Sequence, residues 1–364
     1  VVIYVNGIPV VVLEAKVPGK GLKTAYEQIR QYEAQIPRLF HSNAFNLVTD
    51  AHEFAFGATG ADWGWWSRWR DPWPRQADEF GGEFETGLWS LLEPSRLLDL
   101  LAHFIVFETD PDSGTVVKKI CRYQQYRAVR KISDRIADPD RNRGLIWHTQ
   151  GSGKSLTMVF AALRAKMHRT DPDPAIPNPS VLVVTDRKDL DRQITNTFQA
   201  CGLPNPKPAG SKHDLQTLIH SGTAGLTVLS TIQKFEGSRK PVPNSADWIV
   251  FVDEAHRGQE KDLGAFLRAT FPNAQLFGFT GTPVKKGDLD TFQNFGHPGD
   301  EGYLDRYSID DAVRDGATVP IRYTSRMTQW HVDPEEIDQL FDNWFQYETE
   351  ERREAIKKRG VTLV

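Results

Sequence analysis

A glycine-rich loop between an apolar run and a helix-forming run is the first feature of the sequence that could do chemistry. The loop 151–155 (GSGKS) follows the apolar residues 145–147. Glycines let such a loop curl so that successive backbone N–H groups face an anion at the helix N-terminus. A lysine here reaches the β- and γ-phosphates of a nucleotide, and the next hydroxyl binds Mg²⁺. The predicted nucleotide-binding residues are Gly151, Ser152, Gly153, Lys154 and Ser155, with Ser155 also a metal ligand.

A pair of acidic residues ends a second apolar run. Asp253 and Glu254 directly follow the residues 248–252 (WIVFV). The carboxyl end of a neighbouring parallel strand is where a Mg²⁺–phosphate complex needs a carboxylate, so we assign Asp253 to the metal. Glu254 would position or deprotonate the attacking water. Taken alone, the pair could instead be the acidic cap of a helix N-terminus; after a phosphate-binding loop it predicts nucleotide hydrolysis.

A third apolar run, 276–280, ends in small hydroxyl residues on a tight turn. Thr280, Gly281 and Thr282 could sense the state of the nucleotide and relay it, and we assign them to coupling. Without the two preceding motifs, a plain turn would be a serious alternative for these residues.

The start of the sequence holds a different kind of charged pair. An Asn-Gly turn joins two apolar runs, which is the strongest short signal for a β-hairpin. The second run ends in Glu14-Ala15-Lys16, and alternation along a strand places Glu14 and Lys16 on one face. The pair is either a surface ion pair or half of a metal-dependent nuclease site, in which Glu14 would be a metal ligand.

The elements that must position these residues are short continuous apolar runs separated by helical or loop stretches. Runs that do not alternate between apolar and polar residues are typical of a parallel sheet covered on both faces. The runs lie at 145–147, 181–184, 226–230, 248–252 and 276–280. We therefore predict an α/β fold in this part of the chain.

Composition bounds the classes of protein. The chain has 364 residues, a formal net charge of −4 and only two cysteines, so contacts with nucleic acid must come from local basic patches. Two distant cysteines argue against a disulfide framework and against a zinc site. There is no membrane-length apolar run, and a cytoplasmic protein without membrane contact is expected.

The three motifs, in the order HxxxxGKS, DEAH and TGTP, resemble superfamily 2 helicases and translocases. The resemblance implies that the first motif binds nucleotide, the second hydrolyses it and the third couples hydrolysis to DNA. It implies adenine recognition by Gln125 in RYQQYRAVRK, with Gln124 beside it as the alternative. It also implies DNA contacts at two strand ends, by Arg187, Lys188, Thr231 and Gln233.

Glu14-x-Lys16 followed by Gln28-x-x-x-Tyr32, ahead of such a motor, resembles the R (motor and nuclease) subunit of type I restriction enzymes. The phrases VNGIPVVVLEAK, WHTQGSGKS, TDRKDLD and DEAHRGQ are similar to that family throughout. The resemblance implies a PD-(D/E)xK nuclease with Glu14 and Lys16 as catalytic residues, and Gln28 and Tyr32 on the DNA. It implies ATP and Mg²⁺ as cofactors, double-stranded DNA as substrate, and separate methylase and specificity subunits as partners.

We therefore expect a partial PD-(D/E)xK nuclease domain at 1–112, a RecA-like P-loop lobe at 113–305 and the start of a second lobe at 306–364. The nuclease part departs from the family because no acidic residue precedes Glu14. Both ends of the sequence lie in strand-like runs, so we expect a fragment that lacks DNA cleavage and turns ATP over weakly.

The leading functional hypothesis is an ATP-dependent double-stranded-DNA translocase joined to an endonuclease that cuts nonspecifically, away from the recognition site. The alternatives are an ATP-gated DNA-binding superfamily 2 module without nuclease activity, and a non-catalytic protein with a relic P-loop. A tryptophan-rich tract at 63–73, mixed with arginines, could stack nucleic-acid bases, but such a cluster more often packs against its own domain.

Overall fold

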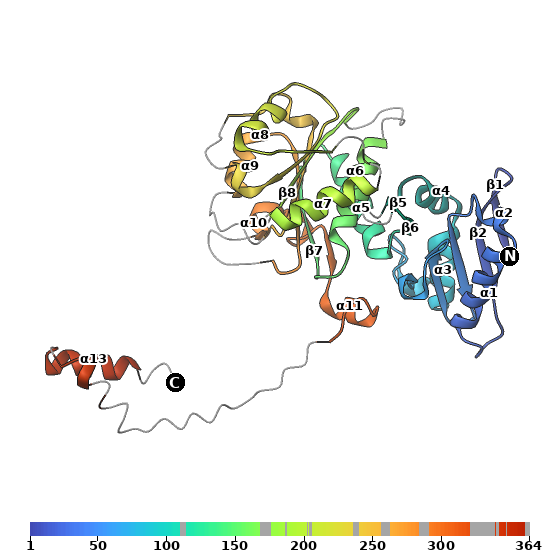
Figure 1. The fold of residues 1–364 in the computed structure, drawn as a ribbon, viewed down its shortest axis with the longest axis horizontal. Coiled ribbons are helices and arrows are strands. Elements are labelled where there is room, and N and C mark those ends of the chain that lie inside the picture. The colour runs from blue at the N-terminus through green and yellow to red at the C-terminus, as the bar shows by residue number, and fades with distance from the viewer. Residues whose placement is uncertain are drawn as a thin grey trace. The chain divides into compact units, whose positions relative to one another are not determined.

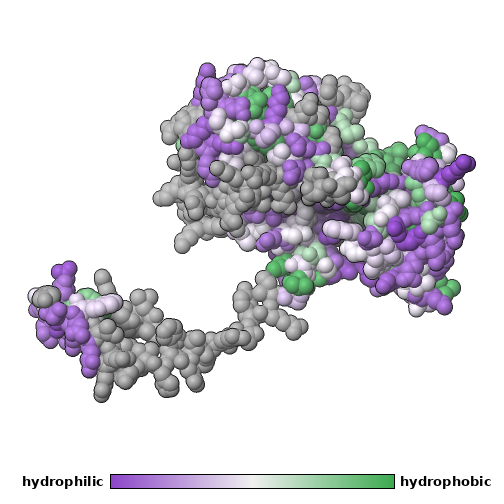
Figure 2. All heavy atoms as spheres, viewed as in Figure 1, coloured by the Kyte–Doolittle hydropathy of each residue, from purple (hydrophilic) through white to green (hydrophobic). Residues whose placement is uncertain are grey.

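A computed structural model describes most of the chain as two compact units, which divide between Val319 and Pro320. The described residues are 1–109, 114–167, 176–185, 188–201, 203, 206–235, 240–255, 263–283, 291–320, 339, 342–346 and 348–360. Among their helices, none has the length and apolar character needed to span a membrane. On the face that Figure 2 shows, hydrophilic side chains cover much of the described surface, with smaller hydrophobic areas between them.

The N-terminal part is a four-stranded sheet in the order β1 (Val2–Val5), β2 (Ile8–Ala15), β3 (Phe45–Thr49) and β4 (Phe54–Ala58). The β1–β2 hairpin is confirmed, because Asn6 and Gly7 have φ values of 50° and 79°, as a two-residue turn of this kind requires. Strands β2 and β3 are parallel, and β3 and β4 are antiparallel. A parallel pair needs a crossover, which α1 (Leu22–Gln35) and α2 (Pro37–Phe40) provide.

Helix α1 packs its apolar face on one side of this sheet. Leu22, Ala25 and Ile29 are buried against Val12 and Val48 in one cluster. Because Val12 and Glu14 are two residues apart on β2, Glu14 lies on the face that α1 covers.

The tryptophan-rich tract packs against the N-terminal sheet and helix α1, and Trp69 also contacts Tyr126 farther along the chain. Trp69 is fully buried, and its ring contacts those of Phe56 and Tyr126. Trp63 and Trp66 pack around Tyr26 of α1. Trp63 and Trp66 therefore pack within their own part of the chain, whereas Trp69 packs against both parts.

Two helices and a two-stranded ribbon follow the tract: α3 (Glu83–Leu92), α4 (Pro94–His103), β5 (Ile105–Thr109) and β6 (Val116–Ile120). Single turns of 3-10 helix lie at Trp63–Trp65 and Ala77–Glu79 before them.

The second part is a seven-stranded sheet in which every pairing is parallel. Its order is β13-β7-β12-β11-β8-β10-β9. The bounds are β7 (Arg143–His148), β8 (Ser180–Thr185), β9 (Pro206–Pro208), β10 (Thr227–Thr231), β11 (Trp248–Asp253), β12 (Gln275–Thr280) and β13 (Asp305–Tyr307). The prediction of an α/β fold with a RecA-like parallel sheet is confirmed.

Helices cover both faces of this sheet (Figure 1). On one face, alternate strand residues such as Val181, Val183 and Phe251 join a core with α5 (Tyr123–Ile136), α6 (Lys154–Met167) and α7 (Lys188–Ala200). On the other, Leu182, Val184 and Val250 join a core with α8 (Lys212–Ile219), α9 (Leu263–Thr270) and α10 (Thr291–Phe295). Burial on both faces explains why these strands read as continuous apolar runs.

Strand β13 and helix α11 (Ile309–Arg314) lie with the first unit, which ends at Val319. The predicted domain boundaries, including the one at 305/306, stay predictions; in the structure, residues 306–307 still pair with β7 as part of the RecA-like sheet. The second unit contains α13 (Glu350–Gly360).

Candidate functional site: a nucleotide site and a nuclease-like pair

Three predicted motifs meet at one edge of the parallel sheet, because their strands β7, β12 and β11 are adjacent in that order. The turn after β12 touches the loop after β7. The Trp147 indole N–H donates to the Gly281 carbonyl at 3.3 Å, and a Cβ added at Gly281 would lie 3.2 Å from the Gln150 backbone nitrogen. Gly281 therefore permits the close approach of these two loops.

The phosphate-binding loop is held open by its glycines and braced by helix α5. Gly151 and Gly153 have φ values of 81° and 84°, a region that glycine enters without strain. The Gln125 amide donates to the Gly153 carbonyl at 3.1 Å, whereas both polar atoms of Gln124 are buried and have no hydrogen-bond partner among the described residues. Of the two glutamines, Gln125 is the one that contacts the loop.

A buried hydroxyl in the loop lacks a partner. Ser152 is 1% exposed, and its Oγ has no hydrogen-bond partner among the described residues. A buried polar group without a partner costs free energy, so such groups in native structures call for an explanation. A bound phosphate would supply an acceptor here.

Lys154 and Glu254 face each other across this edge. The Lys154 Nζ lies 4.0 Å from Glu254 Oε1 and 3.4 Å from the His148 carbonyl oxygen, to which it donates. Both side chains are largely buried. The Lys154 ammonium and the Glu254 carboxylate, which the motifs assign to the phosphates and to the attacking water, therefore lie close together at this edge of the sheet.

Glu254 has a backbone conformation that few non-glycine residues adopt. Its φ is 50°, immediately after strand β11 ends, and its N–H donates to Asp253 Oδ1 at 3.0 Å. Left-handed residues of this kind carry strain, and they cluster at functional sites.

The residues here fit Mg²⁺. Burial, and then the charge of Glu254 beside it, raise the pKa of Asp253 to about 6, although Lys154 offsets part of the shift. A buried carboxylate with too little positive charge nearby is suited to a divalent cation. The Ser155 hydroxyl lies at the start of α6, and Mg²⁺ needs only one or two protein oxygens beside phosphates and waters.

A pH dependence follows from this raised pKa. An unfolded aspartate titrates near 3.8, so as pH falls from 7 toward 4 the folded metal-free protein takes up a proton before the unfolded chain does. We expect the wild type to gain on the order of 2 kcal/mol in free energy of unfolding over this range, relative to Asp253→Asn. Urea unfolding of both proteins without Mg²⁺ measures the difference. A relative loss of wild-type stability toward pH 4 would contradict the assignment.

The predicted coupling residues and two of the predicted DNA residues lie at the ends of β12 and β10, which are separated by β11 and β8 in the sheet. Thr280 is buried at the end of β12, and Thr282 donates its N–H to the Thr280 hydroxyl at 3.1 Å. At the end of β10, Thr231 is buried and Gln233 is exposed. Arg187 lies outside the described residues. Lys188 is the first residue of α7, but its side chain is not among the described ones. The DNA roles of these residues stay predictions.

Glu14 and Lys16 form an ion pair at the end of β2. The Lys16 ammonium donates to Glu14 Oε1 at 2.7 Å, and the two side chains are 24% and 17% exposed. The Lys16 N–H donates to the Thr49 carbonyl at 2.9 Å, which continues the parallel pairing with β3. No group of three or more acidic, histidine or cysteine side chains suited to a metal occurs among the described residues. The metal role of Glu14 stays a prediction.

Gln28 and Tyr32 occupy one side of α1, at spacing i, i+4. The Gln28 amide donates to Gln31 Oε1 at 3.1 Å, and Tyr32 packs at the edge of the cluster between α1 and the sheet.

Sequence reasoning missed a buried group of charges beside the P-loop. Asp305 on β13 is fully buried and accepts hydrogen bonds from His148, Arg127 and Lys131. His148 is the first residue of the motif HxxxxGKS, but nothing in the local pattern marked its partners.

Comparison with known families matches both parts of the chain. Residues 124–354 match the SWI2/SNF2 ATPase family, and residues 1–65 match the N terminus of the type I restriction enzyme R protein.

Two curated relatives cover most of the chain. The HindI endonuclease subunit of a type I restriction enzyme from Haemophilus influenzae is 35% identical over 93% of this chain and 34% of its own length. A protein of Methanocaldococcus jannaschii, provisionally named the MjaIXP endonuclease subunit, is 30% identical over 94% of this chain and 34% of its own. The chain thus spans about a third of the length of these relatives.

Among solved structures, a fragment from Vibrio vulnificus YJ016, provisionally described as an HsdR subunit, is 17% identical, with a TM-score of 0.39 over 85% of this chain and 49% of that one. The family matches carry the assignment. The chain belongs to the SWI2/SNF2 ATPase family, and its first residues match the N terminus of the type I restriction enzyme R protein, the family that its motifs resemble.

Proposed function

We propose that this chain carries the ATP-dependent DNA-translocating part and the Mg²⁺-dependent endonuclease part of a type I restriction-modification system. The observation that carries the motor assignment is the approach of Lys154 to Glu254, 4.0 Å apart, where strands β7, β12 and β11 end side by side. The double family match supports joining this motor to a nuclease.

Each residue of the nucleotide site has a defined task in this proposal. Lys154 neutralises charge on the terminal phosphates, and backbone N–H groups of the 151–155 loop hold them. Gln125, fixed by its contact with Gly153, reads the adenine edge. Ser155 and Asp253 hold Mg²⁺, which neutralises charge on the β- and γ-phosphates when bound. Glu254 orients the attacking water and accepts its proton.

We assign coupling and DNA contact to residues at the ends of other strands of the same sheet. Gly281, between Thr280 and Thr282, approaches the backbone of residues 148–150, so a change at the nucleotide reaches their turn. Arg187, Lys188, Thr231 and Gln233 would follow the DNA backbone, whose binding depends on local positive charge in a chain with net charge −4.

In the nuclease part, Glu14 is the proposed metal ligand and Lys16 stabilises charge on the scissile phosphate. Gln28 and Tyr32 contact the flanking DNA. Double-stranded DNA is cut nonspecifically away from the recognition site, and separate methylase and specificity subunits choose that site. The proposed location is the cytoplasm.

Lys154→Ala in the complete protein, assembled with its methylase and specificity subunits, tests the motor. ATP turnover and translocation are expected to fall at least about a hundredfold, since a preorganised charge at the transferred phosphate is lost. A triplex-displacement assay on double-stranded DNA measures translocation. The control Lys207→Ala removes an exposed lysine of the same lobe. Translocation that survives Lys154→Ala would contradict the proposal.

A further inference from the structure

A single buried carboxylate joins the phosphate-binding loop, helix α5 and the tryptophan-rich tract. Asp305 has no exposed side-chain area, and its oxygens accept from His148 Nε2 at 2.7 Å, Arg127 Nε at 2.7 Å and Lys131 Nζ at 2.8 Å. A buried charge is tolerated only when it is paired and hydrogen-bonded, so losing one partner disturbs the others.

The first of these partners is the residue that enters the phosphate-binding loop. Burial lowers the pKa of His148, and its Nδ1 has no hydrogen-bond partner among the described residues, which fits a neutral ring with its proton on Nε2. The backbone of β13 also contacts the start of the loop, because the Thr149 N–H donates to the Tyr307 carbonyl at 3.0 Å. The loop entry is therefore fastened to β13 by both side chain and backbone.

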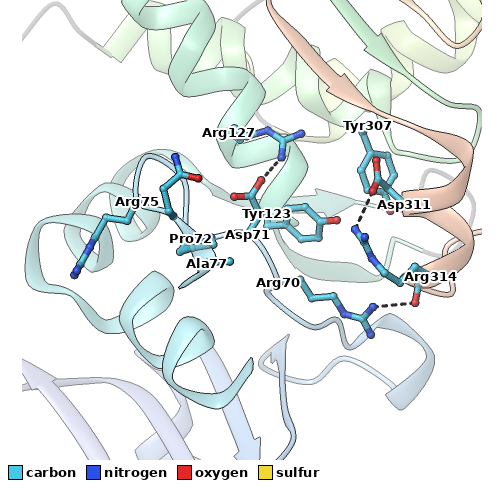
Figure 3. Close-up of a pocket in the computed structure, with 11 residues that line it drawn as sticks. Arg70, Asp71, Pro72, Arg75, Ala77, Tyr123, Arg127, Tyr307, Asp311 and Arg314 are labelled. Carbon is cyan, nitrogen blue, oxygen red and sulfur yellow. Dashed lines mark hydrogen bonds and ion pairs between the residues drawn. The ribbon is translucent and has the colours of Figure 1, made fainter. Parts of the chain in front are cut away.

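The second partner, Arg127, connects Asp305 to helix α5 and to the tryptophan-rich tract. Arg127 lies two residues after Gln125 on α5, and besides Asp305 it pairs with Asp71 of the tryptophan-rich tract (Figure 3). Asp71 organises that tract, since its carboxylate accepts the Trp73 N–H and its carbonyl accepts the Trp69 indole N–H, each at 2.9 Å. One guanidinium thus spans the two carboxylates Asp71 and Asp305.

A cavity lies beside this bridge, but its charged side chains do not indicate a ligand-binding pocket. It encloses about 300 Å³ and is lined by Arg70, Arg75, Arg127 and Arg314 (Figure 3). Each of these guanidiniums already has a carboxylate partner, at Asp315, Glu79, Asp71 and Asp311 respectively. With its positive charges paired, the cavity is better explained as the seam between the tract and the motor lobe.

We propose that Asp305 is a positioning residue for nucleotide binding, and that through His148 and through Arg127–Asp71 it links occupancy of the phosphate-binding loop to attachment of the tract 69–73. The inference rests on the proposed ATP-binding function. Linkage is reciprocal: if the tract's bridge favours the loop conformation that binds nucleotide, nucleotide must favour the bridge by the same factor.

Asp71→Asn in the complete protein is the central test, because Asp71 is part-exposed and its loss leaves the buried Asp305 paired with Arg127. We expect the dissociation constant for a fluorescent ATP analogue with Mg²⁺, and the KM for ATP, to rise at least about fivefold while kcat stays within twofold. Asp71→Glu should restore both. Glu79→Gln, which removes a carboxylate from the same cavity but outside the bridge, should leave them unchanged.

Hydrogen exchange supplies the reciprocal measurement. Adding nucleotide to the wild type should slow exchange in the tract 69–73, and Asp305→Asn or Asp71→Asn should abolish that slowing. If Asp71→Asn binds ATP as tightly as the wild type, with or without a lower melting temperature, the bridge is only structural and the inference is overturned. Failure of the wild type itself to bind ATP would instead overturn the proposed function.

Discussion

Replacing Glu254 by glutamine is expected to lower the turnover number for ATP by two to four orders of magnitude and to leave ATP binding nearly intact. A positioned general base contributes about 10²–10⁴-fold, and the amide cannot accept the water's proton. Binding survives because Lys154, Ser155 and the loop N–H groups are unchanged. Glutamine also keeps the side-chain length at a residue whose φ of 50° constrains the end of β11.

The measurement is steady-state ATP hydrolysis together with equilibrium binding of a fluorescent ATP analogue. Asp247→Asn is the matched control, since Asp247 is an exposed acid that precedes the opposite end of the same strand. A variant that still hydrolyses ATP within tenfold of the wild-type rate would show that another group handles the water. Equal loss of binding and turnover would point instead to collapse of the sheet edge.

The sheet edge itself was predictable from sequence because each motif directly follows a continuous apolar run. Residues 248–252 and 276–280 are buried on both faces, so the apolar pattern by itself indicates a parallel sheet. Parallel strands put their carboxyl ends on one edge, and that rule alone brings Lys154 toward Glu254.

The charges around Asp305 were not predictable by the same reasoning. They come from β13, β7, α5 and the tryptophan-rich tract, segments that have no shared spacing. The strand β13 is only three residues long, too short to show a period, and its central Arg306 is exposed. Long-range ion pairing depends on which segments pack together, and local patterns do not encode it.

Choice between neighbouring residues also needed the structure. The resemblance favoured Gln125, but it left the adjacent Gln124 open as the alternative. In the structure Gln125 accepts the Arg122 N–H at 2.8 Å and reaches Gly153, so the helix start orients it toward the loop. Geometry at a helix N-terminus, rather than residue type, made the distinction.

Glu14→Gln is expected to abolish DNA cleavage by the complete protein while ATP turnover and translocation continue. A metal ligand stabilises the transition state of phosphodiester cleavage by several kcal/mol, so its loss should lower the cleavage rate at least about a hundredfold. The nucleotide site is unaffected, since Glu14 belongs to the N-terminal sheet and the motor residues to the parallel one. Linearisation of circular DNA, followed beside ATP hydrolysis, measures both activities.

This experiment separates chemistry from folding because the Glu14–Lys16 pair contributes little to stability. Both side chains are part-exposed, and pairs of that kind are worth about 0–1 kcal/mol. Glu14→Gln should therefore unfold at nearly the wild-type urea concentration, as should the control Asp78→Asn, an exposed acid of the same part of the chain. Cleavage retained by Glu14→Gln would mean that the pair is a surface ion pair, and the motor would then stand without the nuclease. If Glu14→Gln loses cleavage but unfolds like the wild type, Glu14 has a chemical role. Loss of so weak an ion pair would not unfold the N-terminal sheet.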